Sequence, residues 1–571
     1  MSDSFSPPAD GSTDKSRTTT PIDAIAEDWV ETLIELDPTI GTWIGLPGAH
    51  SGYADYSPEG HAHMMGATRE VLARLEAATI VDDVDLVTKT DMVSTLRLDV
   101  ESDAAGLWMR DLNNLASPAQ DIRAVLDLMP TASPDDWSVI ADRLHNIPEA
   151  IEGYIATLRH GIDNSIVPAQ RQVAELVTQA QQIAATGGFF DDFTAQAAGL
   201  IDADSALSRT LSDGAAAAAG SYRRLEEFLS SELAPRATSQ DAFGRELYAL
   251  QSERFLGAKV DLDETYEWGI EELARMTREQ ESIAREIKPG ATVAEAIEHL
   301  DSDPSRTLHG TEALREWMQK LSDEAVSALA GTHFDIAEPM RALECRIAPT
   351  HDGIIYYTGP SDDFSRPGRM WWSVPESVTE FTTWREATTV YHEGVPGHHL
   401  QIAQAVYNRD QLNTYRRQLS GSSGHAEGWA LYAERFMSEL GFLDDPADRF
   451  GMLDGQRMRA ARVVLDIGVH LGKPRLDGTG VWDYDYALEF LTNNVTLDPA
   501  NVRFEVNRYF GWPGQAPSYK VGQRIWEQLR DECAAIEGDS FDLKEFHRRA
   551  LNVGGVGLDT LRTALLAPYA Q

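Results

Sequence analysis

Hydrophobic positions along most of the chain recur at intervals of three and four residues, which is the spacing of an amphipathic helix. The pattern begins at Pro21 and is clear in DAIAEDWVETLIELD, DMVSTLRLDVESDAAGLWMRDL and VPAQRQVAELVTQAQQIAA. Further helices are predicted at residues 245–255 and 262–287, separated by turns that proline and glycine mark. No fixed-period repeat is evident, so a solenoid is not favoured. The pattern predicts a mainly α-helical protein.

One stretch, between about Pro339 and Trp372, departs from this pattern. The runs MRALECRIAP and GIIYYTGP contain β-branched and aromatic residues and are bounded by proline and glycine, so they predict strands of a small sheet. Helical spacing resumes at Glu380 and continues to the end. We therefore expect a disordered leader over residues 1–22, a helical lobe over 23–335 and a second lobe over 336–571.

Composition narrows the possible partners and the cell compartment. In 571 residues there are 49 Lys and Arg against 91 Asp and Glu, a net charge of −42, which disfavours nucleic-acid and anionic-membrane partners. The two cysteines, Cys345 and Cys533, are too few for a disulfide framework or a thiolate metal cluster. No apolar run is long enough to span a membrane, and the polar N-terminus does not resemble a secretion signal. We expect a cytoplasmic protein.

Residues 380–402, EFTTWREATTVYHEGVPGHHLQI, contain the strongest chemical signal. Adjacent imidazole and carboxylate groups followed by further imidazoles are a zinc-type ligand set. In the familiar H-E-x-x-H motif, two histidines four residues apart bind the metal and the glutamate acts as general base. Here His392 and Glu393 fit that motif, but Pro396 occupies the position of the second histidine. The candidates for the second ligand are His398 and His399.

The spacing of these histidines predicts a break in the helix. With a rise of about 1.5 Å per residue, His392 and His398 would lie about 9 Å apart along a straight helix. Two nitrogens that are each about 2.1 Å from one zinc ion lie no more than about 4 Å apart. The chain must therefore bulge or loop at Pro396-Gly397. The alternative is a histidine cluster that is satisfied by the core beside a helix break.

A third ligand is expected from the segment SGSSGHAEGWALYAERFMSEL, which predicts a helix beginning near His425. Glu427 lies 34 positions after Glu393, a separation that lets one helix turn back beside the other. We predict Glu427 as the ligand, with Glu434 as the alternative. Either glutamate could instead be an ordinary solvated carboxylate.

The motifs HEGVPGHHLQ and EGWALYAE together resemble a bacterial family known only as domain of unknown function 885. That family looks similar to the HExxH-plus-Glu zinc peptidases, which include thimet oligopeptidase, angiotensin-converting enzyme and the thermostable carboxypeptidases. Further matches are RPG at residues 366–368, RMRAARVVLDIGVH ending at His470, and RYFGWPGQAPSYKVG at residues 508–522. The resemblance covers the chain from about residue 25 to its end.

This resemblance implies a mainly helical, zinc-peptidase-like fold with a deep cleft. It implies Zn²⁺ held by His392, by a following histidine and by Glu427, with Glu393 as the base. The peptidases often have Gly-His-x-Leu at the second ligand, which puts His398 in that place and leaves His399 as the alternative. One departure is the loop after His470, where the family usually has Gly-Trp and this chain has Gly472 before Lys473-Pro474.

Further candidate residues lie downstream of the metal motif. A zinc hydrolase needs a donor for the oxyanion, and we predict Tyr519 first and Tyr509 second, although both could be packing aromatics. Arg508 could bind a substrate carboxylate or form a surface ion pair.

Two other features could serve the same site. Arg462, Asp466 and His470 share one helical face, either as support for the metal ligands or as a buried ion-pair network. The GIIYYTGP strand could pair with an extended peptide.

These observations predict a zinc-dependent hydrolase that cleaves peptide or amide bonds of short substrates. In this hypothesis the metal activates water, and Glu393 moves the proton from water to the leaving amine. One alternative is a metal-dependent hydrolase or cyclase acting on a specialised metabolite. Another is a non-catalytic helical binding protein with a relic metal site. The oligomeric state, the native metal and the choice between endo- and exo-cleavage are left open.

Overall fold

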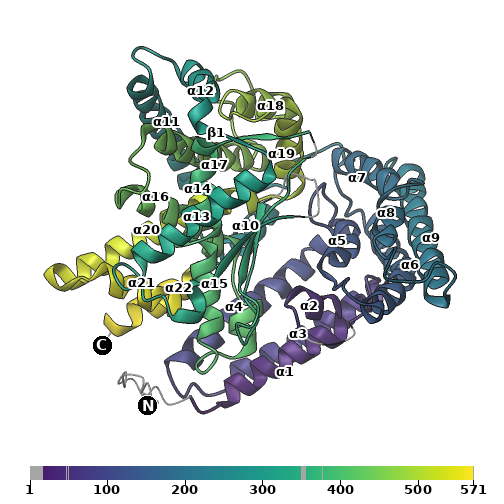
Figure 1. The fold of residues 1–571 in the computed structure, drawn as a ribbon. Coiled ribbons are helices and arrows are strands. Elements are labelled where there is room, and N and C mark those ends of the chain that lie inside the picture. The colour runs from purple at the N-terminus through teal and green to yellow at the C-terminus, as the bar shows by residue number, and fades with distance from the viewer. Residues whose placement is uncertain (1–16, 47, 49, 349–354, 376, 570–571) are drawn as a thin grey trace, which may run out of the picture.

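The fold is seen in a computed structural model, which describes residues 17–46, 48, 50–348, 355–375 and 377–569 (Figure 1). In these residues the elements are 22 α-helices, short 3₁₀ and π turns, and five short strands. The mainly α-helical prediction is confirmed. The predicted leader lies outside the described residues up to residue 16.

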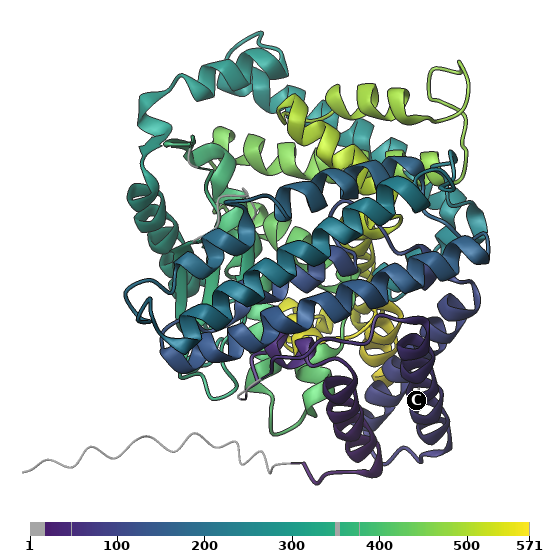
Figure 2. The same ribbon diagram turned by 90° about the vertical axis from the view of Figure 1, so that its right-hand side faces the viewer.

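The first part of the chain forms two groups of helices, each with its own core. The first group is α1 (Pro21–Leu36), α2 (Thr39–Trp43), α3 (Pro58–Ala77) and α4 (Asp83–Ala104). The second is α5 (Pro118–Ala124), α6 (Pro134–Asp163), α7 (Gln170–Ile183), α8 (Phe189–Ala195) and α9 (Ala206–Phe228). Trp29 and Leu75 lie in the core of the first group, and Trp137 and Tyr222 in that of the second. In Figures 1 and 2 the second group forms one side of the molecule.

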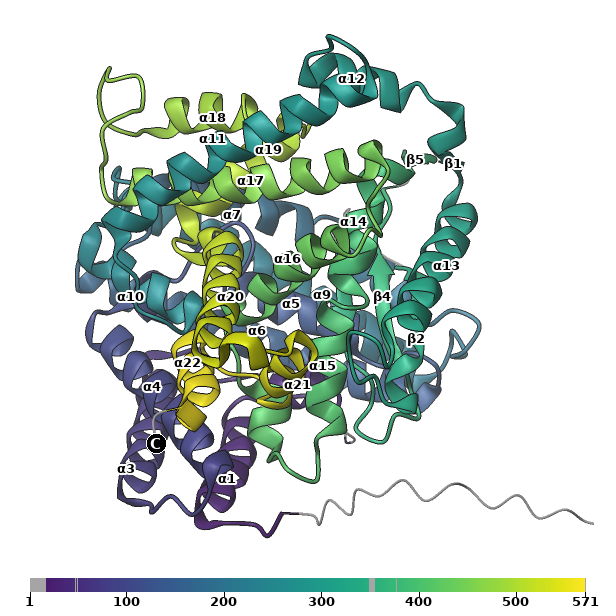
Figure 3. The same ribbon diagram turned by 90° about the vertical axis from the view of Figure 1, so that its left-hand side faces the viewer.

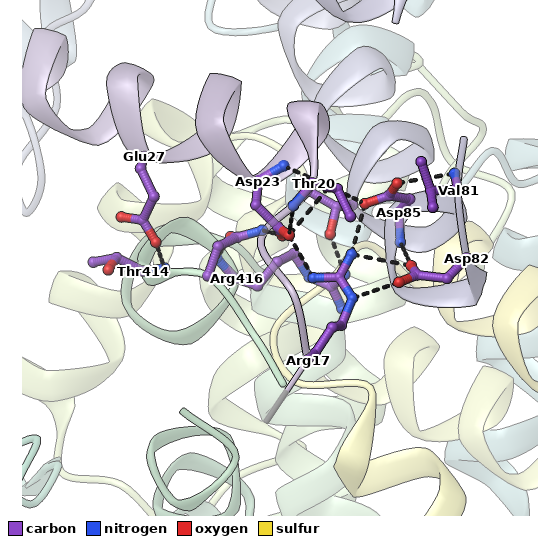
Figure 4. A network of polar contacts seen from close by, with 11 residues as sticks. Arg17, Thr20, Asp23, Glu27, Val81, Asp82, Asp85, Thr414 and Arg416 are labelled. Atoms are coloured by element: carbon purple, nitrogen blue, oxygen red, sulfur yellow. Dashed lines mark hydrogen bonds and ion pairs between the residues drawn. The ribbon is translucent and has the colours of Figure 1, made fainter. Parts of the chain in front are cut away.

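The chain is already ordered before α1 because an arginine anchors it (Figure 4). The Arg17 guanidinium contacts the carboxylates of Asp23 at 2.5 Å, Asp82 at 2.6 Å and Asp85 at 2.6 Å. Thr20 caps α1 in a reciprocal capping box with Asp23, which satisfies free N–H groups at the start of the helix. The end of the predicted leader, residues 17–22, is therefore part of the fold and joins α1 to the start of α4.

The second part of the chain is a larger helical body with a common core (Figure 3). Its helices are α10 (Arg245–Leu256), α11 (Leu262–Ile287), α12 (Val293–Asp301), α13 (Thr311–Leu329), α14 (Thr383–Glu393), α15 (His398–Tyr407), α16 (Ser423–Glu439), α17 (Pro446–His470), α18 (Tyr484–Thr492), α19 (Pro499–Gly511), α20 (Gln515–Glu537), α21 (Leu543–Asn552) and α22 (Leu558–Leu566). This core runs from Tyr248 to Leu565. It crosses the predicted lobe boundary at residue 335 because α10 packs against α16 and α20, and α11 packs against α17.

Two small sheets lie beside α14. β2 (Leu343–Ile347) pairs in parallel with β4 (Gly368–Trp372), and β3 (Ile355–Thr358) pairs antiparallel with the other edge of β4. This three-stranded sheet confirms the prediction for residues 339–372, although Gly353 and Ile354 of the predicted run lie outside the described residues. The second sheet, β1 (Thr307–His309) with β5 (Glu380–Thr382), was not predicted because its strands are only three residues long.

Two expectations from composition can be compared with the described residues. Among them, no helix combines the length and apolarity needed to cross a bilayer. Cys345 on β2 and Cys533 on α20 are both buried free thiols.

Candidate metal centre

The helix that carries the first histidine breaks where the motif predicted. α14 ends at Glu393 and α15 begins at His398, with four residues between them. A side chain at Gly397 would place its Cβ 1.9 Å from the carbonyl oxygen of His392, so only glycine allows this close approach. The indole of Trp429 on α16 donates a 2.8 Å hydrogen bond to the carbonyl of Pro396 and holds the turn in place.

The break brings side chains from three helices together. His392 Nε2 lies 3.3 Å from Glu427 Oε2, and His398 Nε2 lies 3.6 Å from the same oxygen. The two imidazole rings are nearly perpendicular, with centroids 4.8 Å apart. Ligand atoms of His392, Glu393 and His398 also lie within 4.8 Å of one another. The α14–α15 break and the return of the chain along α16 thus gather the predicted set.

These distances fit a bound cation. Ligand atoms about 2.1 Å from a tetrahedral zinc ion lie about 3.4 Å apart, close to the observed separations. Glu427 Oε2 is buried and, among the described residues, has no hydrogen bond, because its contacts with the two Nε2 atoms lack hydrogen-bond geometry. A buried carboxylate oxygen in this state is costly unless a cation compensates it. The residues present therefore fit a metal ion.

Glu434 was the alternative third ligand, but in the structure it contacts the Nδ1 side of His392. It lies two turns after Glu427 on α16, and its Oε1 accepts a 2.7 Å hydrogen bond from His392 Nδ1. Nδ1–H donation leaves the Nε2 lone pair free, which is how carboxylates orient metal-binding histidines. Gln456 of α17 donates to Glu434 Oε2 at 3.2 Å, and Lys520 of α20 donates to Gln456 at 2.8 Å.

The buried charges shift one another's pKa values in the metal-free protein. Burial alone would lower the pKa of His392, but the carboxylates of Glu427 and Glu434 raise it to about 10. Burial alone would raise the pKa of Glu427, but the two imidazoles hold it well below its ordinary value. The two carboxylates therefore favour a positive charge at this place, which a bound cation would supply.

Glu393 ends α14 beside these groups and is itself buried. Burial raises its pKa, and the positive charges of His398 and His392 oppose that rise. A carboxylate with a raised pKa next to a metal centre has the properties of a general base that can also return the proton.

His399 is held by other partners. Its Nε2–H donates to the carbonyl of Met340 at 2.8 Å, and its Nδ1 accepts from the hydroxyl of Tyr357 at 2.8 Å. Burial lowers its pKa to about 4, so the ring is neutral. A Cβ at Gly368 would lie 2.2 Å from that tyrosine hydroxyl, which gives the RPG motif a structural reason. The geometry favours His398 over His399 as the metal-facing histidine.

Of the predicted oxyanion donors, Tyr519 has the more available hydroxyl. Tyr519 is half-buried on α20, where the Arg462 guanidinium lies 5.2 Å from its ring centroid. Its hydroxyl has no hydrogen-bond partner within the described ranges. Tyr509 is fully buried, accepts from Arg462 Nε at 2.7 Å and donates to Glu505.

Arg508 and the three residues on one face of α17 belong to a separate polar network. The terminal nitrogens of Arg508 donate to Glu505 at 3.2 Å and Gln515 at 2.5 Å. Asp466 accepts from Tyr248 at 2.7 Å, and His470 Nε2 donates to the Tyr509 carbonyl at 2.9 Å. None of these contacts reaches the metal ligand candidates, which favours the buried-network interpretation over that of ligand support.

Two features of the centre escaped the sequence interpretation. Gly428 on α16 meets Gly522 on α20, where an added Cβ would lie 2.4 Å from the opposite backbone, so the helices that carry Glu427 and Tyr519 touch closely. The glycines were visible in EGW and YKVG, but their pairing was not. The second feature is Arg459, a half-buried arginine of α17.

A model of the DUF885 family, described as a bacterial protein of unknown function, matches residues 38–565. The chain belongs to the DUF885 family. No curated protein matches it.

Solved structures share the fold of this DUF885 chain. A candidate lipoprotein from Colwellia psychrerythraea superposes with a TM-score of 0.82 at 22% identity, covering 96% of this chain and 99% of its own. A candidate lipoprotein of unknown function from Shewanella oneidensis gives 0.73 at 17% identity, covering 96% and 100%. Pyrococcus furiosus carboxypeptidase gives only 0.37 at 12% identity over 97% and 96%, too low to carry an argument. The lipoprotein names concern those proteins, and the cytoplasmic location predicted here stays a prediction.

The deep cleft implied by the resemblance also stays a prediction. A cavity of about 490 Å³ does occur near α3 and α6, where Tyr56, His61 and Trp108 line it. None of the metal-motif residues contributes to that cavity.

Proposed function

We propose that this DUF885 protein is a zinc-dependent hydrolase that cleaves peptide or amide bonds in short substrates. The observation that carries the proposal is the convergence of two Nε2 atoms, at 3.3 and 3.6 Å, on Glu427 Oε2, which has no hydrogen bond among the described residues. The resemblance of HEGVPGHHLQ and EGWALYAE to the HExxH-plus-Glu zinc peptidases supports the choice of reaction. The short substrate rests on that resemblance alone.

In this proposal His392, His398 and Glu427 hold the metal. Two neutral imidazoles and one carboxylate are a ligand set that zinc commonly takes in hydrolases. The Nδ1 bond from His392 to Glu434 fixes the ring and its tautomer before any metal arrives. A bound zinc ion would polarise the substrate carbonyl and lower the pKa of water.

Glu393 then moves a proton during the reaction. It accepts a proton from the attacking water, whose oxygen forms a bond to the carbonyl carbon. The C–N bond breaks, and the same proton passes to the leaving nitrogen, so no further reactant is needed. The buried position of Glu393, which raises its pKa, suits both halves of this transfer.

Tyr519 is our first choice for stabilising the charge that develops on the carbonyl oxygen. Its hydroxyl has no hydrogen-bond partner in the described structure, and its helix, α20, touches α16 through Gly428 and Gly522. Tyr509 stays second, because its hydroxyl is occupied by Arg462 and Glu505. A preorganised donor of this kind typically contributes about 10²–10³-fold to the rate.

The substitution Glu393→Gln tests the proposal most directly. It removes the base without removing a metal ligand, so turnover of a cleaved peptide should fall by about 10²–10⁴-fold while the zinc content stays near one per chain. Glu386→Gln, on the same face of α14 two turns earlier, is the matched control and should keep both the turnover and the zinc content. Metal analysis by mass spectrometry and initial rates are the measurements. Unchanged turnover in Glu393→Gln would refute its role.

A panel of short peptides, with and without a chelator, separates the remaining possibilities. Chelator-sensitive cleavage supports the peptidase. If the protein binds zinc but cleaves no peptide, the peptidase proposal fails, and the specialised-metabolite hydrolase or the binding protein is favoured. If the purified protein cannot bind zinc, the whole proposal fails.

A further inference from the structure

Arg459 on α17 is a half-buried arginine without a partner. In the part of the chain that the structure describes, its guanidinium has neither a hydrogen bond nor an ion pair, and its Nε is fully shielded from solvent. Its neighbours differ, since Arg457 hydrogen-bonds to Gln280 and Arg462 pairs with Glu505. A buried cation without a partner is costly, so its presence calls for a reason.

Arg459 lies between two residues of α17, one of which contacts Glu434 and the other Tyr519. Three residues before it, Gln456 reaches Glu434, the carboxylate behind His392. Three residues after it, Arg462 lies against the ring of Tyr519. Positions separated by three residues share one face of a helix, so Arg459 lies on the face of α17 that borders the centre.

A glycine makes room for the guanidinium. A Cβ at Gly455, one turn earlier on α17, would lie 2.7 Å from Nη1 of Arg459. The side chain therefore folds back over Gly455 along the part of α17 that packs against α14, the helix that ends at Glu393.

Electrostatics agree with this placement. Arg459 lies near enough to the Glu393 carboxylate and to the Tyr519 hydroxyl for its charge to act on both. The guanidinium therefore borders the predicted base and the predicted oxyanion donor.

A guanidinium prefers a planar carboxylate, which it can bind through two parallel hydrogen bonds. Glu393 passes its proton to the leaving nitrogen, so groups beside it border the leaving part of the substrate. In a C-terminal residue, the free carboxylate is attached to the carbon that bears this nitrogen. We infer that Arg459 binds the free carboxylate of the substrate's C-terminal residue, which makes the protein an exopeptidase that releases C-terminal amino acids.

The inference rests on the proposed function. It assigns to Arg459 the binding of a substrate carboxylate, which the sequence had suggested for Arg508. The terminal nitrogens of Arg508 are taken by Glu505 and Gln515, whereas those of Arg459 have no partner among the described residues. The competing explanation is that Arg459 only tunes the pKa of Glu393. A tuning role would affect every substrate equally, but a binding role depends on the substrate carboxylate.

The test compares N-acetylated dipeptides that end in a free carboxylate with their C-terminal amides. The zinc-loaded wild type should cleave the acids at least about 30-fold better in kcat/KM. Arg459→Gln should lower kcat/KM for the acids by about 10²–10³-fold, the scale of a lost buried charge pair. Its rate on the amides should change less than about threefold. Arg459→Lys keeps the charge but loses the planar fork, so its kcat/KM for the acids should lie between those of the wild type and Arg459→Gln.

Arg457→Gln is the matched control because it makes the same change on the same helix. It should keep the preference for acids. Equal cleavage of acids and amides by the wild type would overturn the inference and leave the proposed hydrolase standing. An equal loss on both substrates in Arg459→Gln, with a shifted pH profile, would also overturn it in favour of a tuning role.

Binding gives a second measurement that needs no turnover. Calorimetry should show the zinc-loaded protein binding L-phenylalanine at least about tenfold more tightly than L-phenylalaninamide, and Arg459→Gln should abolish the difference. If no peptide is cleaved but this difference is found, the carboxylate site stands and the proposed function fails. If neither cleavage nor preferential binding is found, both fail.

Discussion

The metal centre and the polar network between α17 and α19 are both buried clusters of charged residues, but their bonding differs. In the network, Arg462 donates to Glu505 at 2.9 Å and to the hydroxyl of Tyr509 at 2.7 Å. In the candidate metal centre, Glu427 Oε2 is buried without a hydrogen bond in the described structure, and the Nε2 atoms of His392 and His398 lie 3.3 and 3.6 Å from it. The first cluster also has two buried atoms without a hydrogen bond among the described residues, Arg508 Nε and Asp466 Oδ2, but its central carboxylate, Glu505, is paired with protein groups. In the second cluster the carboxylate oxygen that faces the two imidazoles is the unpaired atom.

The difference shows how to separate a structural cluster from a candidate site. A buried polar atom without a partner costs about 1–3 kcal/mol, and more if it is charged. Polar groups that are paired with one another therefore stabilise the fold. A cluster in which an unpaired buried atom faces other ligand atoms is explained if a ligand binds between them. The sequence singled out the histidine motif as the strongest signal, but it left open whether Arg462, Asp466 and His470 support the metal ligands or form a buried ion-pair network.

A substitution of Glu505 should have the largest effect, and it tests whether the polar network is separate from the candidate metal centre. Glu505→Gln leaves Arg462 and Arg508 buried without their carboxylate, and we expect it to lower the free energy of unfolding by about 3–5 kcal/mol. Zinc content should stay unchanged. Urea denaturation and metal analysis are the measurements, with Glu545→Gln, in a surface pair with Arg548, as the control at about 0–1 kcal/mol. Loss of metal with intact stability would place the network in the metal site.

Low pH should remove the contribution of Glu505 to the free energy of unfolding. Burial alone would raise the pKa of Glu505, but Arg462 and Arg508 lower it to about 2, below its unfolded value of 4.5. The stabilisation is therefore present above pH 4.5 and is lost as the pH falls towards 2. The difference in unfolding free energy between wild type and Glu505→Gln should shrink over this range.

A glycine in the helix break should have the next largest effect. Gly397→Ala forces a Cβ to 1.9 Å from the His392 carbonyl, so the break must shift and carry His398 away from Glu427. We expect a loss of about 1–3 kcal/mol in stability together with weaker zinc binding. Gly66→Ala in α3 is the control, since a Cβ there meets nothing within 4 Å and should be neutral or stabilising. Full zinc affinity in Gly397→Ala would refute the role of the break.

A substitution of Glu434 should have the smallest effect, and it tests whether this carboxylate orients His392. Glu434→Gln removes the charge that orients His392 through Nδ1, so zinc affinity should fall by about 10–100-fold without complete loss. Competition with a chromophoric chelator measures the change. Glu439→Gln, at the exposed end of the same helix, should have no effect. Complete loss of zinc in Glu434→Gln would instead indicate that Glu434 is itself a ligand.

Much of the architecture was predictable because it depends on local information. The helical spacing, the strands at residues 343–347 and 355–358, and the break at Pro396-Gly397 all follow from residues near one another in the sequence. The two three-residue strands were not predictable, because such short runs have no recognisable period. The ordered residues 17–20 were missed because Arg17 finds its partners on α4, more than sixty positions away.

By itself, the sequence determined the candidate ligand types and the place where the helix had to open. Only the tertiary structure bound His399 to Met340, gave Glu434 its bond to Nδ1 of His392, and left Arg459 without a partner among the described residues. The reason is physical. Helix periodicity sets which face a side chain occupies, but the atom it meets across that face depends on how close two helices can approach, as the paired glycines of α16 and α20 show for the helices that carry Glu427 and Tyr519.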